Sequence, residues 1–256
     1  MAVPSSQVTK VSTDSPVTKA SKGNASFSPA LVVVDFQEDF CPPAGALAVE
    51  GGRDIAPAIN SLLSLPGFTI RIATKDFHPQ DHVSFASNHP APDNKPYESN
   101  ITIANPENPA EVQTTRLWPD HCVQGTKGAE LVPELDTDKL DHTVEKGKDS
   151  RVEMFSAFYA GFQEPQIANS GLAEMLREKG VTHVYCVGLA YDYCVKCTAI
   201  DAASEGFETY VVEEACRAVD ASKEAHEAVA KDFQKHGVKV VSMDGEEVQR
   251  VRKIAS

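Results

Sequence analysis

The pattern of apolar and polar positions along the chain predicts an alternation of strands and helices. Six apolar runs of strand length, rich in β-branched residues, are "ALVVVD" (30–35), "FTIRIAT" (68–74), "HTVEKG" (142–147), "THVYCVGL" (182–189), "ETYVVEEA" (208–215) and "VKVVSM" (238–243). Continuous apolar runs are typical of strands that are buried on both faces, as in a parallel sheet. We therefore expect a mostly parallel sheet of about six strands.

Helical patterns lie between most of these runs. They are "RDIAPAINSLLSL" (53–65), "GAELVPEL" (128–135), "GLAEMLREKG" (171–180), "YDYCVKCTAIDAASEG" (191–206) and "SKEAHEAVAKDFQKHG" (222–237), and the last three close on a glycine. Strands that alternate with helices indicate an α/β fold with helices on both faces of the sheet. The sequence thus predicts a three-layer, Rossmann-like sandwich.

Two segments stand outside this alternation. Residues 1–27 are rich in Ser, Thr and Lys and lack apolar periodicity, so we expect a tail without fixed structure, followed by a single domain over residues 28–256. Residues 79–119 are rich in Asn, Pro and polar side chains. A long irregular connection inside a compact domain is typically functional, so this segment is predicted to be a functional loop.

Composition and charge narrow the classes of partner. The chain has 256 residues, of which 41% are hydrophobic and 24% charged, and no apolar run approaches the roughly 18 residues that a membrane span requires. A formal net charge of −13 argues against binding to nucleic acid or to an anionic membrane, because phosphate groups would be repelled. We expect a small-molecule partner, and the sequence leaves a homo-oligomer open.

Cysteine usage indicates a reducing compartment. The six cysteines are thinly spread, and no apolar leader opens the chain, so we expect free thiols and a cytoplasmic location, with the nucleus and the peroxisome as further compartments. Cys194 and Cys197 form a Cys-x-x-Cys pair. That spacing fits a redox motif, half of a zinc site or two unrelated thiols on one helical turn, and the cysteines alone do not decide between them.

Three reactive side chains stand at the ends of predicted strands. Asp35 ends the first run, Lys146 lies at the end of the third just before its last residue, and Cys194 follows the fourth where a helical pattern begins. Because reactive groups gather beyond the carboxyl ends of parallel strands, these side chains can form one nucleophilic site in which the carboxylate accepts the thiol proton. Taken singly they suit a loop cap, a solvated lysine and a core thiol, so the hypothesis depends on their joint placement.

A second group of side chains suits a metal ion. Asp76 and His78 follow the second run two residues apart, so in extended geometry both point the same way, and His121 lies at the far end of the long loop. Two imidazoles and a carboxylate are a recurring set for a divalent transition metal with open positions. His82 and His89 are further candidates. The plainer alternative, that these side chains are loop caps and hydrogen-bonding groups, stays open.

Five stretches resemble the isochorismatase-like cysteine hydrolases and, within them, the fungal-type nicotinamidases. They are "LVVVDFQEDFCPPAGAL", "TKDFHPQDHVSFASNH", "LWPDHCVQGTKGAEL", "VEKGKD" and "VGLAYDYCVKCTAIDA", which together span nearly the whole folded region. The Asp-x-His pair with "WPxHC" resembles the nicotinamidase branch. The resemblance implies hydrolysis of nicotinamide, or of pyrazinamide-like amides, to the acid and ammonia through a cysteine thioester, as a step of NAD salvage.

The resemblance also implies roles for individual residues. It makes Asp35 the general base, Lys146 its charged partner and Cys194 the nucleophile. It implies a cis peptide bond between Leu189 and Ala190, with the N–H groups of Ala190 and Cys194 forming the oxyanion hole.

The same resemblance implies a metal site and a substrate pocket. Asp76, His78 and His121 would hold one divalent ion, zinc in the fungal type, which anchors the pyridine nitrogen. His82 is left out of this set, because the additional histidine of some bacterial relatives has a different spacing. Phe40, Trp118 and Tyr159 would be the aromatic side chains that bind the substrate.

Three other functions compete with this one. A metal-independent amidase of the same superfamily, acting on a carbamoyl or ureido substrate, would keep Asp35, Lys146 and Cys194. A thiol redox protein would use Cys194 and Cys197, but the pair lacks the intervening Pro or Gly that usually shapes such a site. A zinc-dependent binding module without catalysis would leave Asp35 and Lys146 unused.

Overall fold

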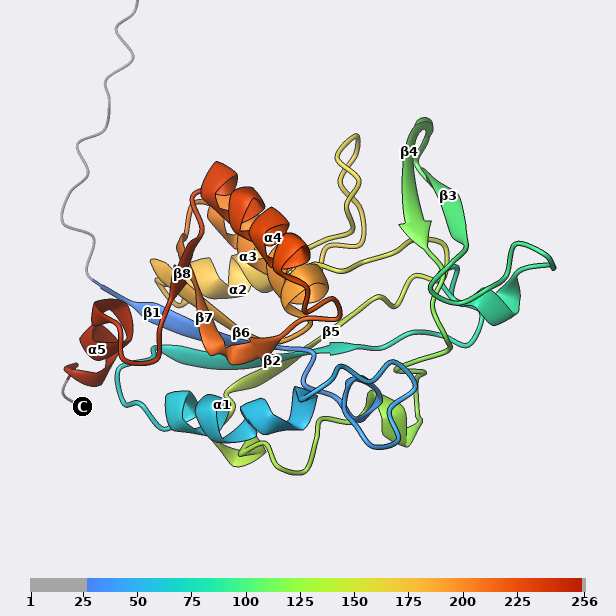
Figure 1. Ribbon diagram of the computed structural model, residues 1–256. Helices are drawn as coiled ribbons and strands as arrows, with labels where there is room; N and C mark the ends of the chain where they lie inside the picture. The colour runs from blue at the N-terminus through green and yellow to red at the C-terminus, as the bar shows by residue number, and fades with distance from the viewer. Residues whose placement is uncertain (1–26, 255–256) are drawn as a thin grey trace, which may run out of the picture.

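The computed structural model describes residues 27–254, so the tail predicted for residues 1–27 lies outside the described residues except for Phe27. The strands are β1 (Pro29–Val34), β2 (Ile70–Asp76), β3 (Asn100–Asn105), β4 (Asn108–Arg116), β5 (His142–Lys146), β6 (His183–Leu189), β7 (Glu208–Arg217) and β8 (Lys239–Val241). The α-helices are α1 (Ala56–Leu63), α2 (Leu172–Glu178), α3 (Lys196–Ser204), α4 (Lys223–His236) and α5 (Glu246–Arg252) (Figure 1). In the described part of the chain, no helix is long and apolar enough to cross a membrane.

Six strands form one parallel sheet in the order β5-β2-β1-β6-β7-β8. Every residue of β1 and of β6, the two central strands, is buried, as the continuous apolar runs predict. The predicted parallel sheet of about six strands is therefore confirmed. The chain order reverses direction between β1 and β6, and in sheets of this kind the crevice beyond the carboxyl ends at such a reversal is where ligands bind.

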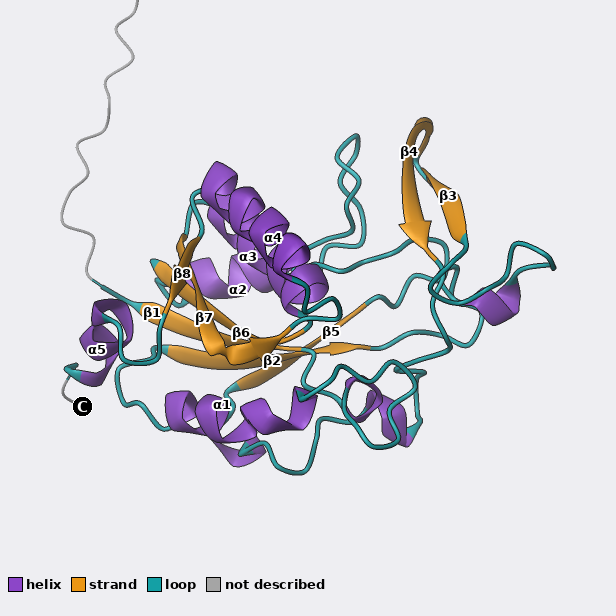
Figure 2. Ribbon diagram, in the orientation of Figure 1, coloured by secondary structure: helices purple, strands orange, loops and turns teal. Residues whose placement is uncertain are grey.

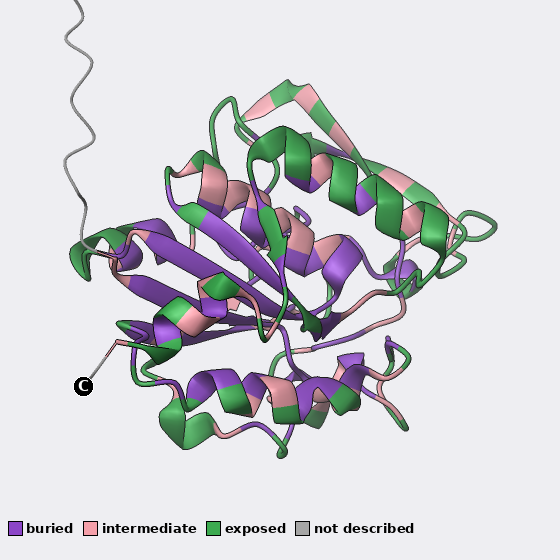
Figure 3. Cartoon of the chain, turned by 60° about the vertical axis from the view of Figure 1, so that its left-hand side comes forward, coloured by how far each residue is buried: buried purple, intermediate pink, exposed green. Residues whose placement is uncertain are grey.

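Helices cover both faces of the sheet. α1 lies on one face, and α2, α3 and α4 lie on the other (Figures 1 and 2). α5 packs its Val248 and Val251 into the core on the α1 side. Each face has its own core: Leu31 and Val33 of β1 point into the first, and Val32 and Val34 into the second. Figure 3 shows that the buried side of each helix is turned toward the sheet and that the exposed side faces outward. The predicted three-layer α/β sandwich is confirmed.

The predicted helix over residues 128–135 is wrong. A short 3-10 turn covers Lys127–Ala129, and the chain then runs extended beside residues 36–38. There the Glu38 N–H donates to the Glu130 carbonyl, and the Val132 N–H donates to the Phe36 carbonyl. Pro133 also disfavours the helical conformation of the residue before it, so these backbone groups pair with another segment. The other four predicted helices form, and α5 is an additional helix.

The segment from 79 to 119 is predicted to be irregular, but it contains a hairpin. β3 and β4 pair antiparallel around a turn at residues 106–107 and project from the body of the protein (Figure 1). An isolated two-stranded ribbon is marginally stable, but Ile103 of β3 packs against Val152, Met154 and Phe162. These contacts come from a distant part of the chain, which explains why local composition did not predict the hairpin.

Gly188 allows β6 to pass close to β1 near the carboxyl end of the sheet. Its φ is +113°, a region that L side chains rarely adopt, and a Cβ at this position would lie 2.1 Å from the Val34 carbonyl oxygen. Val34 and Gly188 are register partners. This close approach brings the residues that follow Gly188 next to Asp35, which follows Val34.

We expect Gly188→Ala to lower the free energy of unfolding by about 3 kcal/mol or more, because backbone strain and overlap with the Val34 carbonyl add together. Gly180→Ala is the control, since Gly180 also has a positive φ (+65°) but has open space around it. That variant should lose only about 1 kcal/mol. Urea denaturation of the two variants measures the difference, and equal losses would contradict the close-approach argument.

Candidate active site

Asp35, Lys146 and Cys194 meet at the carboxyl edge of the sheet, although they come from three separate segments. Asp35 follows β1, Lys146 ends β5, and Cys194 lies in the π-helical turn Tyr191–Val195 between β6 and α3. Lys146 Nζ lies 2.9 Å from Asp35 Oδ2 and 3.7 Å from Cys194 Sγ. All three side chains are buried. The structure therefore brings together the three residues that the sequence placed at strand ends.

The backbone and a neighbouring hydroxyl fix the Asp35 carboxylate. Asp35 has a left-handed backbone conformation with φ of 46°, which is uncommon outside glycine and ends the strand. Thr74 Oγ1 donates to Asp35 Oδ1 at 2.6 Å and accepts from the Asp35 N–H at 3.1 Å. The other carboxylate oxygen is thus left to face Lys146.

Lys146 is shared between two carboxylates. Its Nζ lies 2.5 Å from Asp76 Oδ1 and also donates to the Met154 carbonyl at 3.1 Å. Burial would lower the pKa of Lys146, but Asp35 and Asp76 outweigh it and raise that pKa well above its usual value. The ammonium is therefore a permanent positive charge between the two acids.

Burial sets the protonation of the other two groups. Desolvation raises the pKa of the Cys194 thiol well above its usual value, and the Lys146 ammonium only partly opposes this effect. Desolvation also raises the pKa of Asp35, again against the pull of Lys146. Cys194 therefore rests as a thiol, and its attack on a substrate requires a base. An oxygen of Asp35 and Cys194 Sγ lie within 4.8 Å of each other, which places that base beside the thiol.

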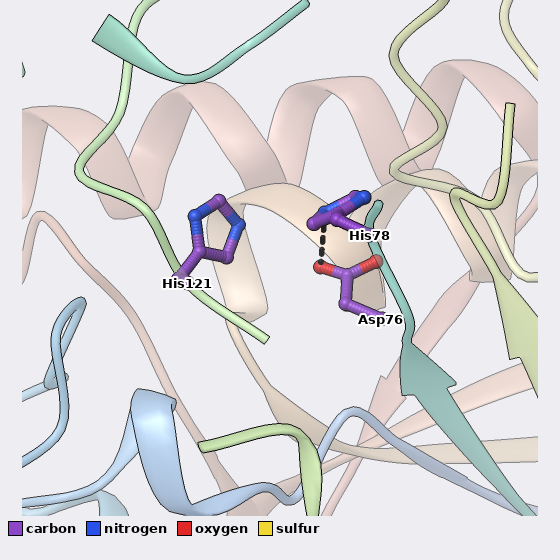
Figure 4. Close-up of side chains that lie close together, drawn as sticks. All are labelled: Asp76, His78 and His121. Atoms are coloured by element: carbon purple, nitrogen blue, oxygen red, sulfur yellow. Dashed lines mark ion pairs between the residues drawn. The ribbon is translucent and has the colours of Figure 1, made fainter. Parts of the chain in front are cut away.

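Asp76, His78 and His121 form a candidate metal site beside these residues. Their potential ligand atoms lie within 4.8 Å of one another, and His121 faces the other two from a separate segment (Figure 4). His78 Nδ1 lies 2.8 Å from the Gly147 carbonyl, and His121 Nδ1 lies 2.8 Å from the Pro119 carbonyl. Carbonyls only accept hydrogen bonds, so both Nδ1 atoms carry protons, and in the neutral rings the free lone pairs lie on the Nε2 atoms.

The donor set of this site fits a divalent cation. His78 Nε2 is buried without a hydrogen-bond partner and lies 3.6 Å from Asp76 Oδ2. Burial alone would lower the pKa of His78, but the Asp76 carboxylate raises it. A positive charge, from a proton or a metal ion, is therefore stabilised beside the His78 Nε2 atom. Burial and the neighbouring His78 lower the pKa of His121 to about 4, which leaves its imidazole neutral at pH 7. Two imidazole nitrogens and a carboxylate can hold the ion.

Gly147 allows His78 to reach this position. A Cβ on Gly147 would lie 2.4 Å from Cε1 of the His78 ring, and the φ of Gly147 is +66°. Any larger residue would displace the His78 imidazole, whose orientation is fixed by the hydrogen bond that it donates to the Gly147 carbonyl. The glycine after Lys146 is thus part of the architecture of the candidate metal site.

His82 and His89 have other partners. His82 Nδ1 lies 2.8 Å from Ser84 Oγ and His82 Nε2 lies 3.1 Å from the Val152 carbonyl, so both ring nitrogens are engaged. Burial lowers the pKa of His82 to about 2. His89 Nε2 lies 2.7 Å from the Val83 carbonyl. These contacts agree with leaving His82 out of the ligand set, and they give both rings a structural role.

One cavity opens onto both groups of residues. Its lining residues are Phe40, Leu47, Asp76, Trp118, His121, Glu153, Phe155, Ala190, Tyr193, Cys194 and Val219. The predicted aromatic residues Phe40 and Trp118 are among them. The peptide bond between Leu189 and Ala190 is cis, as the resemblance implies. The thiol and two of the candidate metal ligands therefore face one largely apolar chamber.

The prediction for Tyr159 needs correction. Tyr159 lines a neighbouring cavity with Asp201 and does not line the one that contains Cys194. The Ala157 N–H donates to Thr198 Oγ1 on α3 at 2.9 Å, which ties this segment to α3 and away from the pocket.

The sequence patterns did not predict several residues that line the cavity. Phe155 and Tyr193 supply further aromatic rings, with their centroids 5.6 Å apart, and the Tyr193 ring lies 5.2 Å from that of Trp118. Leu47, Glu153 and Val219 complete the wall. Tyr193 directly precedes Cys194, so its place in the quoted motif was the one indication available. Nothing in local spacing marks the others.

The Cys-x-x-Cys pair does not act as a unit in this structure. All six cysteines are free. Cys197 is half-buried, lines other cavities than the one containing Cys194, and has its pKa raised to about 11 by burial. A reactive redox pair requires a thiol with a lowered pKa, so the geometry gives no support to that alternative.

The fold and the site define an α/β protein with a buried thiol, carboxylate and ammonium beside a candidate metal site. A family model described as the isochorismatase domain matches residues 29–245. The chain therefore belongs to the isochorismatase family.

Three proteins illustrate its similarity to known members. A nicotinamidase of Schizosaccharomyces pombe is 37% identical over 90% of this chain and 100% of its own length. A crystal structure of the yeast nicotinamidase bound to the inhibitor nicotinaldehyde is 32% identical, with a TM-score of 0.77, over 84% of this chain and 99% of that one. A pyrazinamidase of Pyrococcus horikoshii in complex with zinc is 33% identical, with a TM-score of 0.62, over 84% and 99%.

We expect His78→Ala to weaken zinc binding on the order of 100-fold, because it removes a ligand nitrogen that has no other partner. Isothermal titration of the metal-free protein with zinc measures the affinity. His89→Ala is the control, since it removes a half-buried imidazole that is close to His78 in the sequence but lies outside the candidate metal site. Equal affinity of the His78 variant and the wild type would rule out this metal site.

Proposed function

We propose that this protein is a nicotinamidase, an amidohydrolase that converts nicotinamide to nicotinate and ammonia. One observation carries the proposal: a single cavity exposes the Cys194 thiol together with Asp76 and His121. A pyridine carboxamide has two polar ends, and it can direct its ring nitrogen to the metal ligands while its amide carbon meets the thiol. The names of the relatives and the nicotinaldehyde complex of the yeast nicotinamidase support this substrate class.

The walls of the cavity suit a flat aromatic ring. Four aromatic side chains contribute rings to this cavity: Phe40, Trp118, Phe155 and Tyr193. Aromatic faces and edges bind planar rings through offset-stacked or edge-to-face contacts, and the few polar groups of such a site fix the orientation of the ligand. A ring held in this way leaves its carboxamide at the end of the pocket formed by Ala190 and Cys194.

Asp76, His78 and His121 would hold one divalent cation, which we propose to be zinc. When bound, it supplies a Lewis acid toward which the pyridine nitrogen is directed. The zinc complex of the Pyrococcus horikoshii pyrazinamidase supports the choice of metal.

Asp35 is the general base of the acylation step. As Cys194 Sγ attacks the carboxamide carbon, Asp35 takes the thiol proton, and the N–H groups of Ala190 and Cys194 stabilise the oxyanion. Asp35 then gives the proton to the amide nitrogen, the C–N bond breaks, and ammonia leaves a thioester on Cys194. The raised pKa of Asp35 makes it a stronger base than an exposed carboxylate, and Lys146 stabilises the negative charge as it moves between Asp35 and the thiolate.

Asp35 serves again in the deacylation step. It removes a proton from a water molecule that attacks the thioester carbon, and the same oxyanion hole stabilises the second tetrahedral intermediate. The C–S bond then breaks, Asp35 returns the proton to the Cys194 thiolate, and nicotinate is released. The products are ones that NAD salvage would use.

We expect Cys194→Ala to abolish ammonia release from nicotinamide, with a fall in kcat of about 10⁴-fold or more, because no other group can form the acyl bond. Cys197→Ala, which removes the neighbouring thiol outside the cavity, should keep kcat within about threefold of the wild type. A coupled ammonia assay measures both. Substantial turnover by the Cys194 variant would refute its role as the nucleophile, and a comparable loss in the Cys197 variant would favour a paired-thiol mechanism.

A further inference from the structure

The loop between β7 and α4 carries an apolar side chain into the wall of the substrate cavity. Val219 in this loop is 39% exposed, and it lines the cavity together with Tyr193 and Cys194. An exposed valine at a pocket wall becomes buried when an apolar ligand fills the pocket, and that burial favours binding. The position of this loop therefore decides how closely the cavity fits a bound ring.

A buried carboxylate sets the position of the loop. Asp192 Oδ1 accepts a hydrogen bond from the Val219 N–H at 2.9 Å, and Asp192 Oδ2 accepts one from the Asp220 N–H, also at 2.9 Å. Within residues 27–254, no other hydrogen bond outside the sheet ties the backbone of residues 219–221 to a different element. Hydrogen bonds to an ionised acceptor are about twice as strong as neutral ones, so these two form a strong tether. We call this arrangement the Asp192 latch.

The latch starts from the turn that carries the nucleophile. Asp192 lies two residues before Cys194 in the turn Tyr191–Val195. Its carboxylate is nonetheless directed away from the reacting groups, because Asp192 lines an outer cavity with Lys196 and does not line the substrate cavity. One short turn thus fixes the thiol on one side and the Val219 loop on the other.

We propose that Asp192 is a positioning residue that holds Val219 against the ring of the bound substrate. Val219 is then the side chain that determines how well a flat pyridine ring fits the mouth of the pocket. This inference rests on the proposed hydrolysis of nicotinamide. It adds a residue that acts through the loop and touches neither the substrate nor the reacting atoms.

The first test is independent of activity. In Asp192→Ala, hydrogen–deuterium exchange at the amides of Val219 and Asp220 should become about tenfold faster or more, measured by mass spectrometry of peptides spanning the loop. Trp118 is the protein's one tryptophan and lines the same cavity, so its fluorescence should be quenched more efficiently by acrylamide in this variant. In Asp192→Asn, the exchange rate and the quenching should lie between those of the wild type and of Asp192→Ala, because one amide oxygen replaces two carboxylate oxygens.

The second test separates binding from chemistry. Asp192→Ala and Val219→Ala should each raise KM for nicotinamide about five- to tenfold and leave kcat within about twofold, since only contact with the ring is lost. The double variant should be no worse than the weaker-binding single variant, because both changes remove the same contact. Glu213→Gln, which removes one exposed negative charge from β7 without touching the loop amides, is the matched control and should behave as the wild type.

Unchanged amide exchange in both Asp192 variants overturns the latch, as does a fall in kcat with an unchanged KM. If Asp192→Ala does not fold, Asp192→Asn and Val219→Ala carry the same comparisons. If the wild type releases no ammonia from nicotinamide, the proposed function fails, and amide exchange together with Trp118 quenching still decides whether the latch exists.

Discussion

The site depends on one buried ammonium group, Lys146, which lies between the carboxylates of Asp35 and Asp76. A buried charge without a partner costs several kcal/mol, so each of the two carboxylates requires the ammonium, and the ammonium requires the carboxylates. The order of the strands makes the arrangement possible. Lys146 ends β5 as the register partner of Asp76 on β2, and Asp35 follows the adjacent strand β1. Two carboxylates and one ammonium leave a net negative charge, and the unpartnered His78 Nε2 lies where a cation would balance it.

The segment Gly188–Cys194 concentrates the remaining requirements in seven consecutive residues. Gly188 allows the approach to β1, Ala190 lines the cavity beside the thiol, and Cys194 lies next to the charged group around Lys146. Asp192 extends the same turn to the loop of Val219. The nucleophile, the proposed oxyanion hole and the mouth of the pocket therefore share one piece of backbone. The proposed alignment of the substrate ring with the thiol depends on this sharing.

The sequence predicted what depends on long, local patterns. The six strands and the gathering of Asp35, Lys146 and Cys194 followed from apolar runs and from the residues that end them. The helix at 128–135 failed because its backbone pairs with residues 36–38, and the β3–β4 hairpin was missed because its packing partners lie beyond residue 150. Tyr159, Phe155 and Val219 show the same limit at the site. The turn of the chain toward α3 or toward the cavity depends on tertiary contacts that no local spacing encodes.

The most direct test of this account is rapid-quench mass spectrometry of a single turnover of nicotinamide by the wild type and by Asp35→Asn. We expect a transient nicotinoyl adduct on the peptide that carries Cys194 in the wild type. No adduct is expected in the variant, whose side chain has the same shape but cannot accept the thiol proton. An adduct on another cysteine, or acylation of Cys194 in the variant at the wild-type rate, would contradict the proposed mechanism.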